Sequence, residues 1–180
     1  MDTSALFNAY HNWIIGWKND GRKIWFGTLM FNSLGLNKLS TISLMQGEME
    51  RIYITMLTNI VRNPKSRPSL ELPILIGAPD SPVFKRRPSS RFADLAPNEG
   101  MHYHFLLGEP LTSRLKIPLN QHIVERQNLY VGNRGLVRIV DLRPVTDIRK
   151  NLADYTFKHI KRGTYNLDDI LILPATVLKA

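Results

Sequence analysis

The 180-residue sequence contains no cysteine. This absence excludes disulfide bonds, thiolate metal ligands and a cysteine nucleophile, so any chemistry has to come from His, carboxylate, Lys, Ser or Tyr side chains. No apolar run approaches the length that crosses a bilayer, and residues 1–20 lack the basic start and unbroken apolar core of a signal peptide. A Gly-x-x-x-x-Gly-Lys-[Ser/Thr] phosphate-binding loop is also missing. We therefore expect a cytoplasmic protein with no membrane partner and no ATP-driven helicase activity of its own.

Acidic residues are comparatively few. Lys and Arg together number 24 against 15 Asp and Glu, which gives a formal net charge of +9 and a pI near 10.0. This balance favours a polyanionic partner, although it does not distinguish DNA from RNA or acidic lipid. A length of 180 residues with 43% hydrophobic content suits one ordinary core, so we expect residues 1–180 to form a single domain.

Hydrophobic periodicity predicts a mixed α and β fold. Three segments have apolar residues at helical spacing: 4–17, 40–63 and 148–162. Four short apolar runs predict strands: 23–32, 72–76, 102–107 and 136–142. Residues 169–174 fit either a last edge strand or a docked tail.

Capping residues mark the ends of two of these helices. Ser40 or Thr41 can cap the second helix, which should pack on the sheet and end near Asn63-Pro64. Its apolar stripe consists of Met45, Met49, Ile52, Met56 and Ile60. Asp147 can cap the third helix, and Gly163 ends it.

Three segments stand outside the regular pattern: an accessory N-terminal helix in residues 1–20, a long basic loop at 77–101 and a C-terminal tail at 164–180. So long a loop in a compact domain is usually functional or mobile. Its cationic side chains, together with two that end the last helix, could follow the phosphate backbone of a single strand. They are Lys85, Arg86, Arg87, Arg91, Lys161 and Arg162. A merely solubilising loop is the equally weighted alternative.

His102 and His104 are candidate metal ligands. Residues two apart on a strand point to the same face, so both imidazoles could reach one divalent ion. A His-x-His pair also arises by chance, and by itself it indicates little.

The last predicted helix has two distinct sides. One side carries a tyrosine and cationic groups: Tyr155, Lys158, His159 and Arg162. The other side is apolar: Ala153, Phe157 and Ile160. A solvated basic face with an incidental tyrosine is the simpler interpretation when this helix is considered alone.

The order of these motifs resembles the HUH endonucleases. Residues 23–162 present a strand, a helix, a strand carrying His-hydrophobic-His, another strand and a helix carrying Tyr-x-x-Lys. The segment Gly100-Met101-His102-Tyr103-His104 is similar to the second motif of that superfamily, which includes rolling-circle replication initiators, plasmid relaxases and single-tyrosine transposases. The resemblance implies an α+β fold of the ferredoxin or RRM-like kind. A central antiparallel sheet of about five strands would carry both histidines on a middle strand, with flanking helices.

The resemblance also implies a function, namely site-specific nicking and rejoining of single-stranded DNA. Tyr155 would attack a phosphodiester and form a covalent 5′-phosphotyrosine, which a later 3′-hydroxyl can reverse. Mg²⁺ or Mn²⁺ held by His102 and His104 would polarise the phosphate, and Lys158 would stabilise the developing charge. The role would be rolling-circle replication or mobilisation of a mobile element, with a separate helicase to unwind the duplex.

The third metal ligand has three candidates. His159 is favoured because some single-tyrosine members take this ligand from the tyrosine helix. Asp80 and Glu99 are rivals, because a hard divalent ion prefers a carboxylate oxygen. Each also has a simpler role: Asp80 as a cap of the Ser81-Pro82 turn, Glu99 as a solvated charge, and His159 as a DNA contact.

Two other functions fit the same residues. One is a catalytically silent, basic nucleic-acid-binding protein with the same fold. The other is an unrelated metal-dependent phosphodiesterase that uses water as its nucleophile. Only the nickase forms a covalent protein–DNA adduct, so that adduct separates the three hypotheses. The sequence implies no particular oligomeric state.

Overall fold

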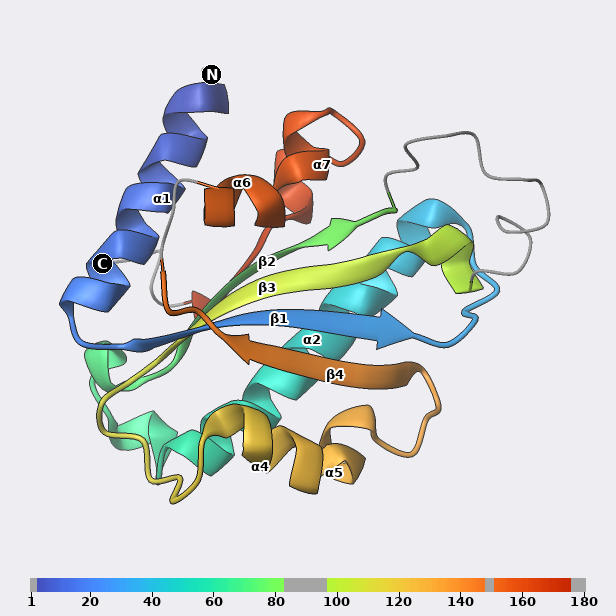
Figure 1. The fold of residues 1–180 in the computed structure, drawn as a ribbon. Coiled ribbons are helices and arrows are strands. Elements are labelled where there is room, and N and C mark those ends of the chain that lie inside the picture. Colours follow the sequence, from blue (N-terminus) through green and yellow to red (C-terminus); the bar gives the residue numbers. More distant parts are fainter. Residues whose placement is uncertain (1–2, 83–96, 148–150, 176–180) are drawn as a thin grey trace.

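The computed structural model describes residues 3–82, 97–147 and 151–175 (Figure 1). They form a five-stranded antiparallel sheet flanked by helices, which confirms the predicted α+β class. The strands are β1 (Lys23–Phe31), β2 (Ile74–Asp80), β3 (His102–Glu109), β4 (Val137–Pro144) and β5 (Leu171–Leu173). Their order across the sheet is β4-β1-β3-β2-β5, so β3 is the middle strand.

Helices cover both faces of this sheet (Figure 1). The longest, α2 (Lys38–Ile60), crosses one face, while α1 (Thr3–Asn19) and the pair α6 and α7 lie on the other. The shorter helices are α4 (Leu119–Glu125), α5 (Gln127–Val131), α6 (Asn151–Thr156) and α7 (Lys158–Lys161). Single 3-10 turns are η1 (Pro64–Ser66), η2 (Ser69–Glu71) and η4 (Leu167–Asp169). The short segment η3 (Pro97–Gly100) is a turn whose backbone is not helical at Asn98 and Glu99.

Helix α2 supplies the core of its face. The predicted stripe of Met45, Met49, Ile52, Met56 and Ile60 is fully buried, which confirms the helical spacing. The predicted cap, Ser40 or Thr41, was wrong. The side chain of Asn37 accepts a hydrogen bond from Ser40 N and caps the helix, which therefore begins at Lys38. It ends at Ile60, because Val61 is already extended.

Helix α1 is built into the same core. Phe7, Ile14 and Trp17 are buried, and the helix packs against α6, β1 and β3. None of the helices in the described part of the chain is both long and apolar enough to span a membrane.

Strand β2 is longer than its apolar run indicates. The sequence predicts a strand over residues 72–76 and a loop from Gly77, but β2 continues to Asp80. Proline is tolerated at position 79 because β5 pairs only as far as Gly77, so no neighbouring ladder on that side requires the missing N–H. Residues 171–173 form β5, which pairs with β2 as an edge strand. Of the two predicted alternatives, the segment is therefore a strand and not a docked tail.

Phe105 on β3 sits between glycines of its two neighbours. Gly27 of β1 and Gly77 of β2 are both paired with Phe105. A Cβ atom at Gly27 would lie 2.1 Å from the Phe105 ring, and one at Gly77 would lie 2.8 Å from Phe105 Cβ. Gly27 therefore makes the space that the Phe105 ring fills, and Gly77 leaves room for the Tyr103 ring as well as for Phe105 Cβ.

Candidate functional site

The predicted placement of His102 and His104 is confirmed. Both lie on the middle strand β3, and their side chains converge on one face, with the two Nε2 atoms 3.1 Å apart. His104 is buried, and His102 is partly buried at the start of the strand. The strand spacing alone accounts for this convergence, because alternate residues share a face.

Asp80 completes the group from the neighbouring strand. It is paired directly with His102 in the β2–β3 ladder, and its side chain is completely buried. Its Oδ2 atom lies 3.0 Å from His102 Nε2 and 3.1 Å from His104 Nε2. One ligand atom from each of the three residues falls within 4.8 Å of the others, so this cluster could hold a metal ion.

The outer ring nitrogens of both histidines have their own partners. His102 Nδ1 lies 2.9 Å from Gly100 O, and His104 Nδ1 lies 3.1 Å from Thr28 Oγ1. A carbonyl oxygen can only accept, so His102 Nδ1 carries a proton. When the imidazole is neutral, its Nε2 is therefore the nitrogen that is free to bind a cation. Metal-binding histidines are typically held in this way, with the outer nitrogen donating to a fixed partner.

The buried polar atoms of this site fit a cation. Both carboxylate oxygens of Asp80 and Nε2 of His159 are buried, and among residues 3–82, 97–147 and 151–175 none of these three atoms has a hydrogen bond of acceptable geometry. Their neighbours lie at ion-pair distances instead, and the Lys158 ammonium is one of these neighbours, at 2.7 Å from Asp80 Oδ2. Lone pairs that face one another across about 3 Å are unfavourable without a positive charge between them. A divalent ion would satisfy these donor atoms together.

The charge states at the centre suit metal binding. Burial disfavours the Asp80 carboxylate, but contacts with His102, His104 and Lys158 outweigh burial and hold its pKa well below the ordinary range. Burial lowers the pKa of His104, against the opposing attraction of Asp80. A charged carboxylate beside a neutral imidazole is the form in which both residues act as ligands.

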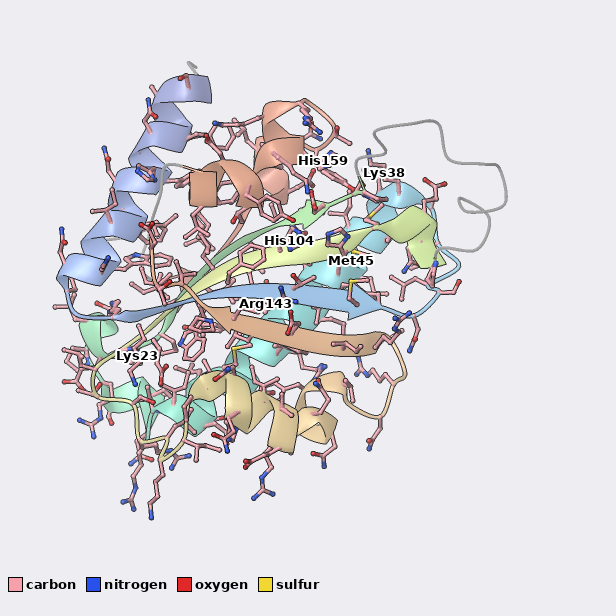
Figure 2. The ribbon with its side chains drawn as sticks, viewed as in Figure 1. Lys23, Lys38, Met45, His104, Arg143 and His159 are labelled. Atoms are coloured by element: carbon pink, nitrogen blue, oxygen red, sulfur yellow. The ribbon has the colours of Figure 1, made fainter. Side chains whose placement is uncertain are left out.

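The three candidates for the third ligand lie at different distances from the histidines. Asp80 is between them in the tight cluster. His159 comes from α7 beside the end of β2 (Figure 2), and its Nε2 lies 3.4 Å from Asp80 Oδ1. Glu99 is exposed in η3 and does not belong to the tight cluster found among the described residues. A ligand role for His159 stays a prediction.

Tyr155 and Lys158 reach the same site from the C-terminal part of the chain. The Tyr155 side chain is half exposed, and its ring centre lies 5.4 Å from that of His104. Lys158 Nζ lies 4.6 Å from the centre of the Tyr155 ring and 2.7 Å from Asp80 Oδ2. Lys158 thus contacts both the tyrosine and the acidic residue of the cluster.

The predicted single helix over residues 148–162 was wrong in detail. The described part consists of α6 and α7, separated at Phe157, where φ is −108°. Thr156 Oγ1 donates to Leu152 O one turn back, a bond that tends to bend helices. Ala153, Phe157 and Ile160 are buried as predicted, and Gly163 follows the end of α7 with a positive φ.

The predicted cationic side of this segment is not uniform. His159 is buried against Asp80, whereas Arg162 is exposed. Burial lowers the pKa of His159 against the opposing charge of Asp80. Lys161 pairs with Asp154, and its Nζ lies 5.1 Å from the centre of the Phe7 ring. The other predicted DNA contacts lie outside the described residues: Lys85, Arg86, Arg87 and Arg91.

Two site neighbours on β1 were not predicted. Phe26 lies beside both His104 and Tyr155, with ring centres 4.9 and 5.6 Å away, and Thr28 contacts His104. Both lie within the apolar run KIWFGTLMFN. Because most residues of this run are apolar, the sequence does not show which of them point to the face that carries the histidines. Tyr165, the nearest rival nucleophile, is buried and hydrogen bonds to Ser81.

Comparisons of this chain with protein-family models, curated proteins and solved structures find no match.

Proposed function

We propose that this chain is a metal-dependent nickase and strand transferase acting on single-stranded DNA, of the HUH single-tyrosine type. The observation that carries the proposal is the position of Lys158. Its ammonium contacts Asp80 Oδ2 at 2.7 Å and lies 4.6 Å from the centre of the Tyr155 ring. A tyrosine, a lysine and a candidate metal cluster from three separate parts of the sequence thus meet at one place.

The chemistry that these residues support is a reversible transesterification. The hydroxyl of Tyr155 gives its proton to water, and its oxygen forms a bond to phosphorus. The bond to the 3′ oxygen breaks, and that oxygen takes a proton from water and leaves as a 3′-hydroxyl. The DNA stays attached to Tyr155 through its 5′-phosphate. Attack by a 3′-hydroxyl on this phosphotyrosine restores the phosphodiester, so nicking and rejoining are one reaction in two directions.

Each side chain has a distinct part in this scheme. Asp80, His102 and His104 would hold Mg²⁺ or Mn²⁺, which supplies Lewis-acid polarisation of the scissile phosphate. Lys158 stabilises the negative charge that develops on the phosphoryl group or the phenolate. The half-exposed ring of Tyr155 leaves its surface open to a DNA strand. Burial of Tyr165 makes that residue unsuitable as a nucleophile and raises the pKa of its hydroxyl.

The proposed role is rolling-circle replication or the mobilisation of a mobile element. The net charge of +9 suits a single-stranded DNA partner. Strand separation would need helicase activity from outside these 180 residues, because they contain no phosphate-binding loop for ATP.

The decisive experiment looks for the covalent adduct. The protein is incubated with a pool of single-stranded oligonucleotides of random sequence and Mn²⁺, and denaturing electrophoresis detects a shifted band. Tyr155→Phe should abolish the band, whereas the matched control Tyr165→Phe, which also loses one hydroxyl, should retain it. Mass spectrometry should find the nucleotide on the peptide that contains Tyr155. Cleavage without any adduct would instead favour a phosphodiesterase that uses water.

A catalytically silent nucleic-acid-binding protein is the second candidate, and one observation favours it. The Lys158 ammonium already neutralises the buried Asp80 carboxylate, so the charge of this cluster can be balanced without a metal ion. That protein would bind single-stranded DNA with the same affinity in Mn²⁺ and in chelator. It would bind no Mn²⁺ in calorimetry and form no adduct.

A further inference from the structure

Three consecutive residues before β3 have left-handed backbone conformations. The φ angles are 55° at Asn98, 56° at Glu99 and 78° at Gly100. Asparagine tolerates this region, but glutamate adopts it rarely, so something outside the turn has to hold it in place. Gly100 cannot be replaced easily, because a Cβ atom there would lie 2.8 Å from Pro82 Cγ.

The side chain of Asn98 holds the turn. Its Oδ1 accepts a hydrogen bond from Leu34 N at 2.8 Å, and its Nδ2 donates to Asn32 O at 2.8 Å. Asn98 O also accepts from Met101 N at 2.9 Å. The amide therefore ties the turn to the segment that leaves β1, using one acceptor and one donor at once. Among uncharged side chains of this length, only asparagine offers both.

The turn delivers one backbone atom to the candidate metal cluster. Gly100 O lies 2.9 Å from His102 Nδ1 and, as a carbonyl, can only accept. The partner of His104 differs, because the Thr28 hydroxyl can donate or accept and so does not select a tautomer. Of the two histidines, only His102 has a partner that selects its tautomer. That partner is Gly100 O, whose position is set by the turn.

We propose that Asn98 is a positioning residue of the metal centre. It fixes residues 98–100 so that Gly100 O keeps a proton on His102 Nδ1, which leaves Nε2 of the neutral imidazole as the atom that binds the ion beside Asp80. This inference rests on the metal-binding part of the proposed function, but it does not require that Tyr155 attacks DNA.

The test compares Asn98→Ala and Asn98→Asp with the parent protein. Nitrogen NMR of the imidazoles in chelator reports the His102 tautomer, and calorimetry reports Mn²⁺ affinity. Asn98→Ala should give a mixture of the two His102 tautomers and weaken Mn²⁺ binding about 10- to 100-fold, the range of lost partners behind a metal ligand. Asn98→Asp keeps the acceptor for Leu34 N and loses the donor to Asn32 O, so its effect should be smaller.

Two controls separate positioning from general damage. Asn63 also has a left-handed conformation, with φ of 53°, and it has no side-chain capping bond. Asn63→Ala should therefore remove a similar backbone preference without changing the His102 tautomer or Mn²⁺ affinity. Glu99→Gly relieves the left-handed glutamate, keeps Gly100 O, and should also leave both readouts unchanged.

A folded Asn98→Ala protein with the parental tautomer and parental Mn²⁺ affinity would overturn the proposal. If Asn98→Ala does not fold, Asn98→Asp supplies the same two readouts. A parent protein that binds no Mn²⁺ would refute the metal site, and the tautomer measured in chelator would still decide the role of Asn98. A missing DNA adduct would refute the nickase. The His102 tautomer and the Mn²⁺ affinity would still test the role of Asn98.

Discussion

Over residues 102–105, the two faces of strand β3 carry opposite kinds of buried side chain. His102 and His104 point to the face under α6 and α7, where they meet Asp80, while Tyr103 and Phe105 point to the face covered by α2. Burial is nearly as complete on both faces, so burial alone does not mark a site. The difference lies in whether the buried atoms are satisfied. On the first face carboxylate oxygens lack well-formed hydrogen bonds, and on the second apolar atoms fill the space.

The largest expected effect comes from the apolar face. Phe105→Ala leaves a cavity between Gly27 and Gly77, neither of which has a side chain to fill it. We expect a loss of about 3–5 kcal/mol in the free energy of unfolding. Because Phe105 points away from the histidines, Mn²⁺ affinity of the folded protein should stay near the parental value. Urea unfolding and calorimetry test the two parts, and a large loss of Mn²⁺ affinity would show that the faces are coupled.

The corresponding change on the polar face is Asp80→Asn. It keeps the shape of the side chain and removes the charge shared by both histidines and Lys158. Mn²⁺ affinity should fall by more than about 100-fold, beyond the range of partners that do not touch the metal. His159→Ala serves as the comparison in the same titration. A greater loss from His159→Ala than from Asp80→Asn would make His159 the third ligand, as the motif spacing favours.

Lys158→Met tests the connection between the metal cluster and the tyrosine. Methionine keeps most of the length and removes the ammonium, so the rate of adduct formation should fall by about 10²-fold. Mn²⁺ affinity should be equal or higher, because the ammonium and the ion compete for Asp80 Oδ2. Single-turnover gels and calorimetry measure the two quantities. Weaker Mn²⁺ binding in this variant would mean that Lys158 supports the ion instead of competing with it.

What the sequence could predict follows from how local each feature is. The convergence of His102 and His104 needs only the period of one strand, so the motif was sufficient. Asp80 was named as a candidate, but its position opposite His102 depends on β2 continuing through Gly77 and Pro79, two residues that favour a loop reading. Nothing in the local pattern indicates that β5 is short enough to tolerate that proline.

Other features were missed for related reasons. Helices α4 and α5 have seven and five residues, too few for periodicity to distinguish them from a polar loop. The break at Phe157 and the buried position of His159 depend on how α6 and α7 pack against β2 and β3. The turn at Asn98 is held by backbone atoms of residues 32 and 34, a contact over more than sixty positions of the sequence. Such contacts are set by the register of the sheet and have no local signal.

The smallest expected effect comes from Tyr130→Phe, which tests whether an unsatisfied buried polar atom always indicates a functional site. Tyr130 is fully buried on α5, which packs against β4 and α2, and its hydroxyl has no hydrogen-bond partner among the described residues. His122, whose ring centre lies 6.0 Å away, has a similarly unsatisfied Nε2. If only the cluster around Asp80 binds a ligand, burial of the Tyr130 hydroxyl destabilises the protein and contributes nothing to activity. Tyr130→Phe should then stabilise the protein by roughly 1 kcal/mol and leave Mn²⁺ affinity and adduct formation unchanged.

The pH dependence of this variant provides an independent check. Burial raises the pKa of Tyr130 to about 12, above the ordinary value of 10.0. A group whose pKa is higher in the folded state contributes stability that is complete below the ordinary pKa and is lost as pH rises through the folded value. Stability of the parent should therefore decline between about pH 10 and 12, and Tyr130→Phe should lack that part of the decline. Urea unfolding at several alkaline pH values measures it, and parallel curves for the two proteins would show that the hydroxyl ionises as readily in the folded state as in the unfolded state, as it would in contact with water.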